Sequence, residues 1–345
     1  MESNNQNKYL LIYHREDNDG VFSAGLIYYY LLNGLKVNAD DIDLMPMDYN
    51  SMNHIGNKEA IDNLIMQYHI IVLTDISFDA TIMKYMYDNL ADRMIWIDHH
   101  APIIYQSYKM HFDAVNGVRD TDRSAILCAW KYLYDQFDVQ YIAHEIPELL
   151  EILSAWDSFT FSKRGYTKDY VYNVNKGVTV QLKLDFQQVL SMIETIMYWQ
   201  SKKQFGECIV EEESDLIKGL HHLGQGLNLY EQEKYDELVK NYADLTFNIK
   251  LDNGSLRSAA AVFVQSPTSS IMFKSLVGSN IKNGIVFKRQ SDGNWTISLY
   301  NVNEDDHFHC GDFMKSRYNG GGHLGAAGCV VNEAKFIKIL KNKTL

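Results

Sequence analysis

Carboxylates and imidazoles gather at three places in the first hundred residues, each time just after an apolar run. The three groups are His14, Asp17 and Asp19; Asp75; and Asp98, His99 and His100. Carboxylate oxygens together with imidazole nitrogens suit Mn²⁺ and similar divalent ions, and the lack of thiolates argues against a structural zinc site. Two such ions about 3.5–4 Å apart can activate a water and stabilise charge on an attacked phosphorus.

For these groups to act together, the apolar runs before them must be neighbouring strands of one sheet. The runs predict strands at Tyr9–His14, Ile42–Tyr49, His69–Ile76 and Met94–His100. Helical patterns follow at Val21–Leu32 and near Asp79–Leu90. This alternation indicates a mostly parallel sheet with helices on both faces. In such sheets ligands bind at the carboxyl ends of the strands, which is where all three groups fall.

Each group has a structural interpretation when it is taken alone. Residues 17–20 (DNDG) are typical of a turn. Asp75 could cap the helix that follows it, and the pair His99-His100 could be incidental. Three groups at one sheet edge favour the functional interpretation.

The rest of the chain predicts a helical region and then a second, smaller α/β domain. Helical spacing covers about Arg123–Trp156 and most of Leu182–Tyr242. Strand-like runs return at Leu245–Leu251, Ala259–Val264, Gly284–Lys288 and Trp295–Tyr300. We therefore predict an α/β protein with a catalytic domain at 1–180, a helical connector at 181–242 and a second domain at 243–345.

Composition indicates a folded protein with a small or short substrate. Of the 345 residues, 46% are hydrophobic and 22% charged, which is typical of soluble globular chains. No apolar run reaches membrane-spanning length, and the first eight residues (MESNNQNK) lack a signal-peptide pattern, so we expect a cytoplasmic protein without a membrane partner. The net charge of −12 disfavours binding of long nucleic acids.

The four cysteines are far apart and show no CxxC spacing, which predicts reduced thiols. Cys310 lies near His307 and His309, so a small metal site there is an alternative, although nothing nearby completes its ligand set.

Four motifs in order, HREDNDG, the Asp75 strand end, IDHH and GGGHLGAAG, resemble the DHH phosphoesterase superfamily in its branch with a DHHA1 domain. This nano-RNase and RecJ-like branch also includes cyclic-dinucleotide phosphodiesterases. The resemblance implies two Mn²⁺ ions, with Mg²⁺ or Co²⁺ as alternatives. It implies that Asp75 bridges the two ions, with His14 and Asp17 on one ion and Asp19, His99 and Asp157 on the other.

The resemblance also implies roles around the metals. Asp98 would orient a ligand imidazole, and His100 would lie against the scissile phosphate as a charge stabiliser or acid. In the second domain, the glycines Gly320, Gly321 and Gly322 with His323 would approach the substrate, although a glycine-rich turn before a strand is the structural alternative. The second domain is expected to close over the substrate from the other side of a cleft.

Two departures bear on the substrate. The first motif is one residue tighter than the HxxPDxD form of nano-RNases, and Ser298-Leu299 is followed by Tyr300 where many of them have an arginine. We therefore predict a metal-dependent phosphoesterase acting on phosphodiester or phosphomonoester bonds of short oligonucleotides or small nucleotides by a two-metal-activated water. The alternatives are a cyclic-dinucleotide phosphodiesterase, a single-strand exonuclease and a catalytically silent nucleotide-binding sensor. A homodimer is compatible with the sequence.

Overall fold

The computed structural model describes residues 8–136, 145–204, 210–242, 246–265, 270–303, 306–322 and 324–345. The chain divides into two compact units, Met1–Leu227 and Asn228–Leu345. The division falls within the long helix α10 (Val210–Tyr242).

A four-stranded parallel sheet forms the centre of the first unit, as the sequence predicts. Its strands are β1 (Tyr9–His14), β2 (Ile42–Met47), β3 (Ile70–Thr74) and β4 (Met94–Ile97), in the order β2-β1-β3-β4. The central strands β1 and β3 are almost wholly apolar because both faces of the sheet are covered.

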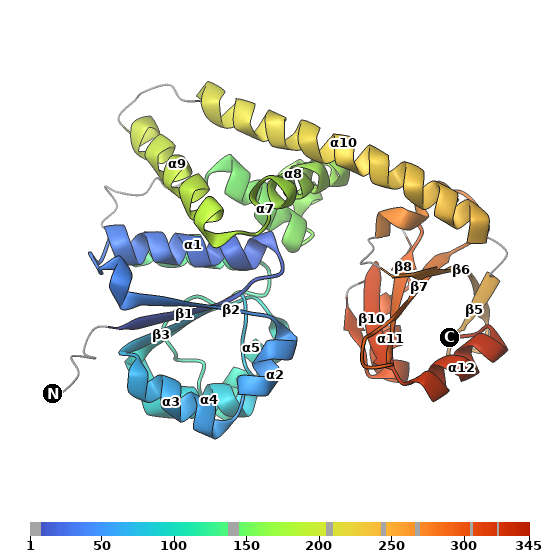
Figure 1. The fold of residues 1–345 in the computed structure, drawn as a ribbon, viewed down its shortest axis with the longest axis horizontal. Coiled ribbons are helices and arrows are strands. Elements are labelled where there is room, and N and C mark those ends of the chain that lie inside the picture. Colours follow the sequence, from blue (N-terminus) through green and yellow to red (C-terminus); the bar gives the residue numbers. More distant parts are fainter. Residues whose placement is uncertain are drawn as a thin grey trace. The chain divides into compact units, whose positions relative to one another are not determined.

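Alternate residues of β1 point into two separate cores. Leu11 and Tyr13 pack against one layer of helices, while Leu10 and Ile12 pack against the other. The first layer comprises α1 (Asn18–Asn33), α6 (Ala125–Gln136), α7 (Glu148–Asp157), α8 (Lys168–Leu182) and α9 (Phe186–Gln204), together with the part of α10 that carries Ile217 and Leu220. The second comprises α2 (Tyr49–Ile55), α3 (Lys58–Gln67), α4 (Ala80–Leu90) and α5 (Ala101–Met110). The two layers lie on opposite sides of the sheet (Figure 1).

Short 3-10 turns complete the first unit at Ala39–Asp41, Ala91–Arg93 and Phe161–Arg164. In the described part of the chain, no helix is long and apolar enough to cross a membrane. The cysteines at 128, 310 and 329 are buried free thiols, as expected, and Cys208 lies outside the described residues.

The second unit is built on a six-stranded sheet. Its strands are β5 (Thr246–Lys250), β6 (Leu256–Val264), β7 (Asn283–Arg289), β8 (Trp295–Asn301), β9 (Gly321–Gly322) and β10 (Ala326–Val331), in the order β5-β6-β7-β8-β10-β9. Only β6 and β7 pair in parallel among these described strands. Helices α11 (Cys310–Tyr318) and α12 (Glu333–Asn342) pack on one face. The 3-10 turn Ser270–Leu276 and the end of α10 pack on the other.

Helix α1 starts so close to the end of β1 that only glycine fits its first turn. A Cβ atom on Gly20 would lie 2.1 Å from the carbonyl oxygen of His14. Asp17 accepts a hydrogen bond from the Gly20 amide at 2.9 Å and so caps the helix. This tight junction brings Asp17 and Asp19 back toward the carboxyl edge of the sheet, beside His14.

Candidate metal centre

Asp75 lies immediately after β3 in a conformation that side chains rarely adopt. Its φ is +57°, in the left-handed region. The following helix α4 is capped by Asp79, which accepts hydrogen bonds from the amides of Thr81 at 2.8 Å and Ile82 at 3.3 Å. The alternative that Asp75 caps this helix is therefore wrong. A strained, buried aspartate without a capping role points to a functional position.

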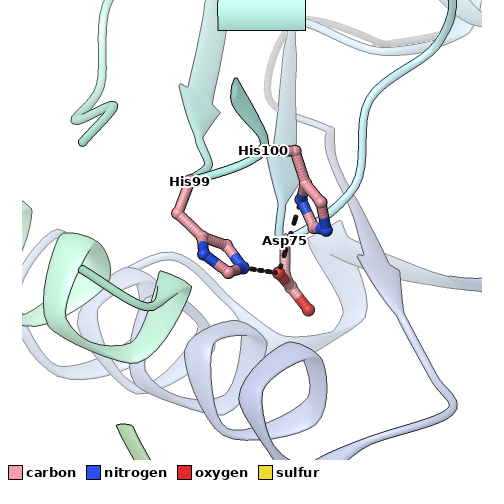
Figure 2. Close-up of side chains that lie close together, drawn as sticks. All are labelled: Asp75, His99 and His100. Atoms are coloured by element: carbon pink, nitrogen blue, oxygen red, sulfur yellow. Dashed lines mark ion pairs between the residues drawn. The ribbon is translucent and has the colours of Figure 1, made fainter. Parts of the chain in front are cut away.

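The side chains of His99 and His100 converge on Asp75, as Figure 2 shows. Oδ1 of Asp75 lies 3.2 Å from Nε2 of His99 and 3.9 Å from Nδ1 of His100. One ligand atom from each of the three residues lies within 4.8 Å of the others. The ends of β3 and β4 thus form a first group able to bind a cation.

A second group shares His99. Its Nε2 atom lies 3.4 Å from Oδ2 of Asp157 and 3.7 Å from Oδ2 of Asp19. Asp157 is the last residue of α7, where the helix dipole disfavours a carboxylate, so a stability role does not explain it. Asp19 also accepts the amides of Ala125 and Ile126, at 2.7 and 2.9 Å, which fixes its carboxylate at the start of α6.

His14 and Asp17, the remaining predicted ligands, pair with each other beside these groups. Nε2 of His14 lies 3.5 Å from Oδ2 of Asp17. The charge of Asp17 contributes to the raised pKa values of Asp75 and Asp157, which shows its proximity to both. The structure therefore brings all six predicted ligands, His14, Asp17, Asp19, Asp75, His99 and Asp157, to one edge of the sheet.

Negative charge at this edge is concentrated and incompletely neutralised. Burial, followed by the neighbouring carboxylates, raises the pKa of Asp75 and of Asp157 well above the ordinary value. Burial also raises the pKa of Asp19. Oδ1 of Asp75 and Oδ2 of Asp157 are buried, and neither accepts a hydrogen bond from the described residues. Oxygen and imidazole ligands with unsatisfied lone pairs fit hard divalent cations.

Asp98 is fully buried and organises the Asp-His-His segment. Its Oδ1 accepts the backbone amides of His99 at 2.7 Å and His100 at 3.1 Å, and lies 2.7 Å from Nδ1 of His100. The imidazole that it orients is thus that of His100, which it contacts through Nδ1. Burial would raise the pKa of Asp98, but the hydrogen bond and charge of His100 outweigh it and leave this pKa low. The same contact overcomes burial and raises the pKa of His100.

Two residues that support Asp98, Trp96 and Arg119, were not predicted from the sequence. The indole nitrogen of Trp96 donates to Oδ2 of Asp98 at 3.0 Å. The guanidinium of Arg119 lies 5.4 Å from the Trp96 ring centre and donates to the carbonyl oxygens of Trp96 and Val115. Trp96 could have been found from its place two residues before Asp98 on a strand, which puts both side chains on the same face.

Comparisons with known proteins identify the architecture. No family model and no curated protein matches the chain. Among solved structures, the DHH domain of a protein assigned to a family of ribosomal proteins has a TM-score of 0.52 at 15% identity, over 98% of this chain and 86% of that one. This chain has the DHH-domain fold.

Two further DHH-type structures align over nearly the whole chain at lower scores. The pGpG-specific phosphodiesterase PggH of Vibrio cholerae has a TM-score of 0.46 and 13% identity, over 97% of each chain. RecJ of Thermus thermophilus in complex with Mn²⁺ has a TM-score of 0.46 and 15% identity, over 98% of this chain and 51% of that one.

Tyr49 is a further residue at the carboxyl edge of this sheet that the sequence did not single out. Its ring centre lies 5.5 Å from that of His14 and 5.9 Å from that of His100. Burial of the hydroxyl and then the charges of Asp98 and Asp75 raise its pKa well above the usual range. The hydroxyl therefore stays protonated, although the side chain is 44% exposed.

In the second unit, the glycines Gly320, Gly321 and Gly322 lie beside α11. Gly321 and Gly322 form β9, which pairs with β10, and Gly322 has a φ of +144°. A Cβ atom on Gly311 would lie 2.2 Å from the Gly322 carbonyl oxygen. Gly320 connects α11 to β9, and His323 lies outside the described residues.

The alternative metal site near Cys310 gains no support from the described residues. Nδ1 of His309 accepts the amide of Asp312 at 3.1 Å and so caps α11. The Cys310 thiol donates to Oδ1 of Asn301, and burial raises the pKa of the thiol to about 12. Over the described ranges, the residue groups able to hold a metal are those of the first unit's sheet edge.

Proposed function

We propose that this protein is a metal-dependent phosphoesterase that hydrolyses phosphodiester or phosphomonoester bonds of short oligonucleotides or small nucleotides. The observation that carries the proposal is the pair of ligand groups that share His99 at the carboxyl edge of the parallel sheet. Within these groups, Oδ1 of Asp75 and Oδ2 of Asp157 are buried and accept no hydrogen bond from the described residues, as expected for a cation site. The DHH-domain fold agrees with this assignment.

The ligand set suits two Mn²⁺ ions, with Mg²⁺ or Co²⁺ as alternatives. Asp75 would contribute to both sites, with His14 and Asp17 on one and with Asp19, His99 and Asp157 on the other. When bound, the ions would supply the Lewis acidity that generates a nucleophile from water and stabilises negative charge on phosphorus. The strained backbone at Asp75 and the anchoring of Asp19 by α6 hold these carboxylates in place before any ion binds.

His100 would act on the substrate. Because Asp98 holds Nδ1 and raises the pKa of the ring, His100 carries a proton over a wider pH range than a free histidine. The protonated ring can donate from Nε2 to a phosphate oxygen and stabilise the charge that develops during attack. Asp98 is therefore proposed as the residue that orients this donor.

A small substrate suits this chain better than a long strand. The net charge of −12 opposes binding to extended polyanions, whose affinity depends on basic surface. The dinucleotide pGpG, for which PggH is named, is one compound of suitable size to test. We further propose that Gly320, Gly321, Gly322 and His323 contact the substrate, because glycines allow close backbone approach to phosphate or sugar.

Product release from a substrate panel, with and without Mn²⁺, tests the proposal. The panel contains pGpG, a five-residue oligonucleotide, a long single strand, 3′-phosphoadenosine 5′-phosphate and a cyclic dinucleotide. We expect Mn²⁺-dependent cleavage confined to the small substrates, loss of more than about 100-fold in rate for Asp75→Asn, and none for the exposed control Asp88→Asn. Progressive degradation of the long strand would favour an exonuclease. Metal binding with no turnover of any substrate would contradict the proposal and favour a sensor.

A further inference from the structure

A cavity opens beside His100 within the first unit. Its volume is about 510 Å³. Helix α2 contributes Tyr49 and Met52 to its wall, and the β3–α4 loop contributes Phe78 and Asp79. His100, Pro102 and Ile103, at the start of α5, also line it, and Gly56 and Ser77 complete the wall. Pockets of about 300–1,000 Å³ hold small organic ligands, so the volume suits a flat ring with attached sugar.

The chemistry of the wall favours a neutral ring over a second phosphate group. Met52 and Phe78 are buried, 3% and 2% exposed, and present an apolar surface. Among the described residues that line the cavity, His100 is the sole cationic group and Asp79 is an acid. The exposed ring of Tyr49 provides a face on which an aromatic ligand can stack.

Asp79 gives the cavity a hydrogen-bond acceptor in a fixed place. Its Oδ1 atom caps α4 through the amides of Thr81 and Ile82, which holds the carboxylate in one orientation. The other carboxylate oxygen, Oδ2, accepts no hydrogen bond from the described residues around the cavity. A carboxylate oxygen accepts but never donates, so it favours a ring that carries an amino group over one that carries a carbonyl.

We propose that this cavity is a nucleobase subsite that selects bases bearing an exocyclic amino group, with Tyr49 stacking on the base and Asp79 accepting from its amino group. The proposal rests on the proposed phosphoesterase function, because His100 both lines the cavity and lies in the ligand group with Asp75. A nucleotide whose base occupies the cavity would thus present its phosphate to His100.

Binding of nucleosides to the EDTA-treated protein tests this without any hydrolysis. Ligand-detected NMR would compare cytidine with uridine and adenosine with inosine, two pairs in which an amino group is replaced by a carbonyl. We expect the amino-bearing member of each pair to bind about fivefold more tightly. Tyr49→Ala should weaken binding of all four by about tenfold, whereas Tyr105→Ala, at an exposed tyrosine of α5 outside the cavity, should leave binding unchanged.

Asp79→Asn provides the second variant, because asparagine caps a helix as well as aspartate does and the fold should be retained. It should abolish the preference for cytidine and adenosine while leaving overall affinity similar. Equal binding by wild type and Tyr49→Ala, or a preference unchanged in Asp79→Asn, would overturn the subsite. Failure of the hydrolysis panel with intact nucleoside selectivity would instead count against the phosphoesterase and not against the subsite.

Discussion

At the scale of single residues, the buried carboxylate of Asp98 acts through its neighbours. It holds the ring of His100 and the backbone amides of His99 and His100, while Trp96 anchors its other oxygen. Residues that orient functional side chains in this way typically change activity by about 10–100-fold when they are removed. Trp96 should therefore matter for catalysis although it is fully buried.

We predict that Trp96→Phe lowers kcat about tenfold and changes KM little, because the Asp98–His100 pair loses one anchoring hydrogen bond. The pH dependence of kcat should shift as well. Trp130→Phe is the matched control, since its indole nitrogen is buried without a hydrogen-bond partner among the described residues. Steady-state kinetics across pH would measure both variants, and an equal loss in the two would reduce Trp96 to a packing role.

The buried carboxylates of the site should lower the stability of the metal-free protein. The pKa of Asp75 is raised in the folded state by burial and by Asp19 and Asp17. The protonated form of Asp75 is therefore favoured in the folded state. Its contribution to the free energy of unfolding is fully present below the unfolded pKa of about 3.9 and is lost as the pH rises through the folded pKa. The pKa of Asp157 is also raised in the folded state, so its contribution changes with pH in the same direction.

We accordingly predict that Asp75→Asn, which cannot ionise, unfolds at a higher temperature than wild type at pH 8 in EDTA. The gain should be about 2–4 °C per kcal/mol of relieved repulsion, and it should shrink toward pH 4. With Mn²⁺ present the order should reverse, because the variant lacks a ligand. Thermal unfolding at pH 4, 6 and 8 would show this, and a variant less stable than wild type at pH 8 in EDTA would count against the repulsion.

The sequence was sufficient to predict which ligands lie together, because parallel strands place their carboxyl ends on one edge. It was not sufficient for Tyr49, Trp96 and Arg119. Tyr49 appeared as the end of a strand. Arg119 reaches the site through the backbone carbonyls of Trp96 and Val115 and through the ring of Trp96. Such contacts depend on tertiary packing and leave no periodic signal.

At the scale of elements, the junction between β1 and α1 fixes the first ligands. Gly20 lies where any side chain would collide with the backbone at His14, which cannot move without disturbing the strand. By contrast, a Cβ atom on Gly25 of the same helix would meet the end of the Ile193 side chain, which can rotate.

We predict that Gly20→Ala destabilises the protein by about 2 kcal/mol or more and weakens Mn²⁺ binding, because α1 must shift and carry Asp17 and Asp19 with it. Gly25→Ala should cost much less, since alanine favours helix by about 1 kcal/mol. Urea unfolding and calorimetric titration with Mn²⁺ would compare the two. Similar losses of stability and of Mn²⁺ affinity in both variants would show that the β1–α1 junction does not position the ligands.

Long apolar runs made the strands predictable, whereas short helices that depend on a capping residue were not predicted. The predicted strands match β1 to β8 within a few residues, and the predicted helices match α1 and α4. Helix α2 was missed because the seven residues Tyr49–Ile55 are too short to show a period and depend on the Asp48 cap. The predicted fourth strand extended to His100, but the chain leaves the sheet at Ile97, where Asp98 turns it toward α5.

At the scale of the whole molecule, every predicted metal ligand belongs to the first unit. The ligands lie between His14 and Asp157, within Met1–Leu227. The second unit has its own cores, in which Phe336 stacks on Trp295 with ring centres 3.8 Å apart. Since a ligand stabilises only the structure that binds it, Mn²⁺ should affect the two units unequally.

We predict that Mn²⁺ at about 100 times its Kd stabilises the first unit by about 2.7 kcal/mol and leaves the second unchanged. Differential scanning calorimetry should resolve two transitions, of which one rises by about 5–10 °C. Phe336→Ala identifies the other, because it removes a buried ring from the second unit alone. The shift should grow from pH 5 to pH 8, since protons compete with Mn²⁺ for carboxylates whose pKa values are raised. A Mn²⁺ shift confined to the transition that Phe336→Ala lowers would place the bound ions in the second unit and contradict the site at the sheet edge.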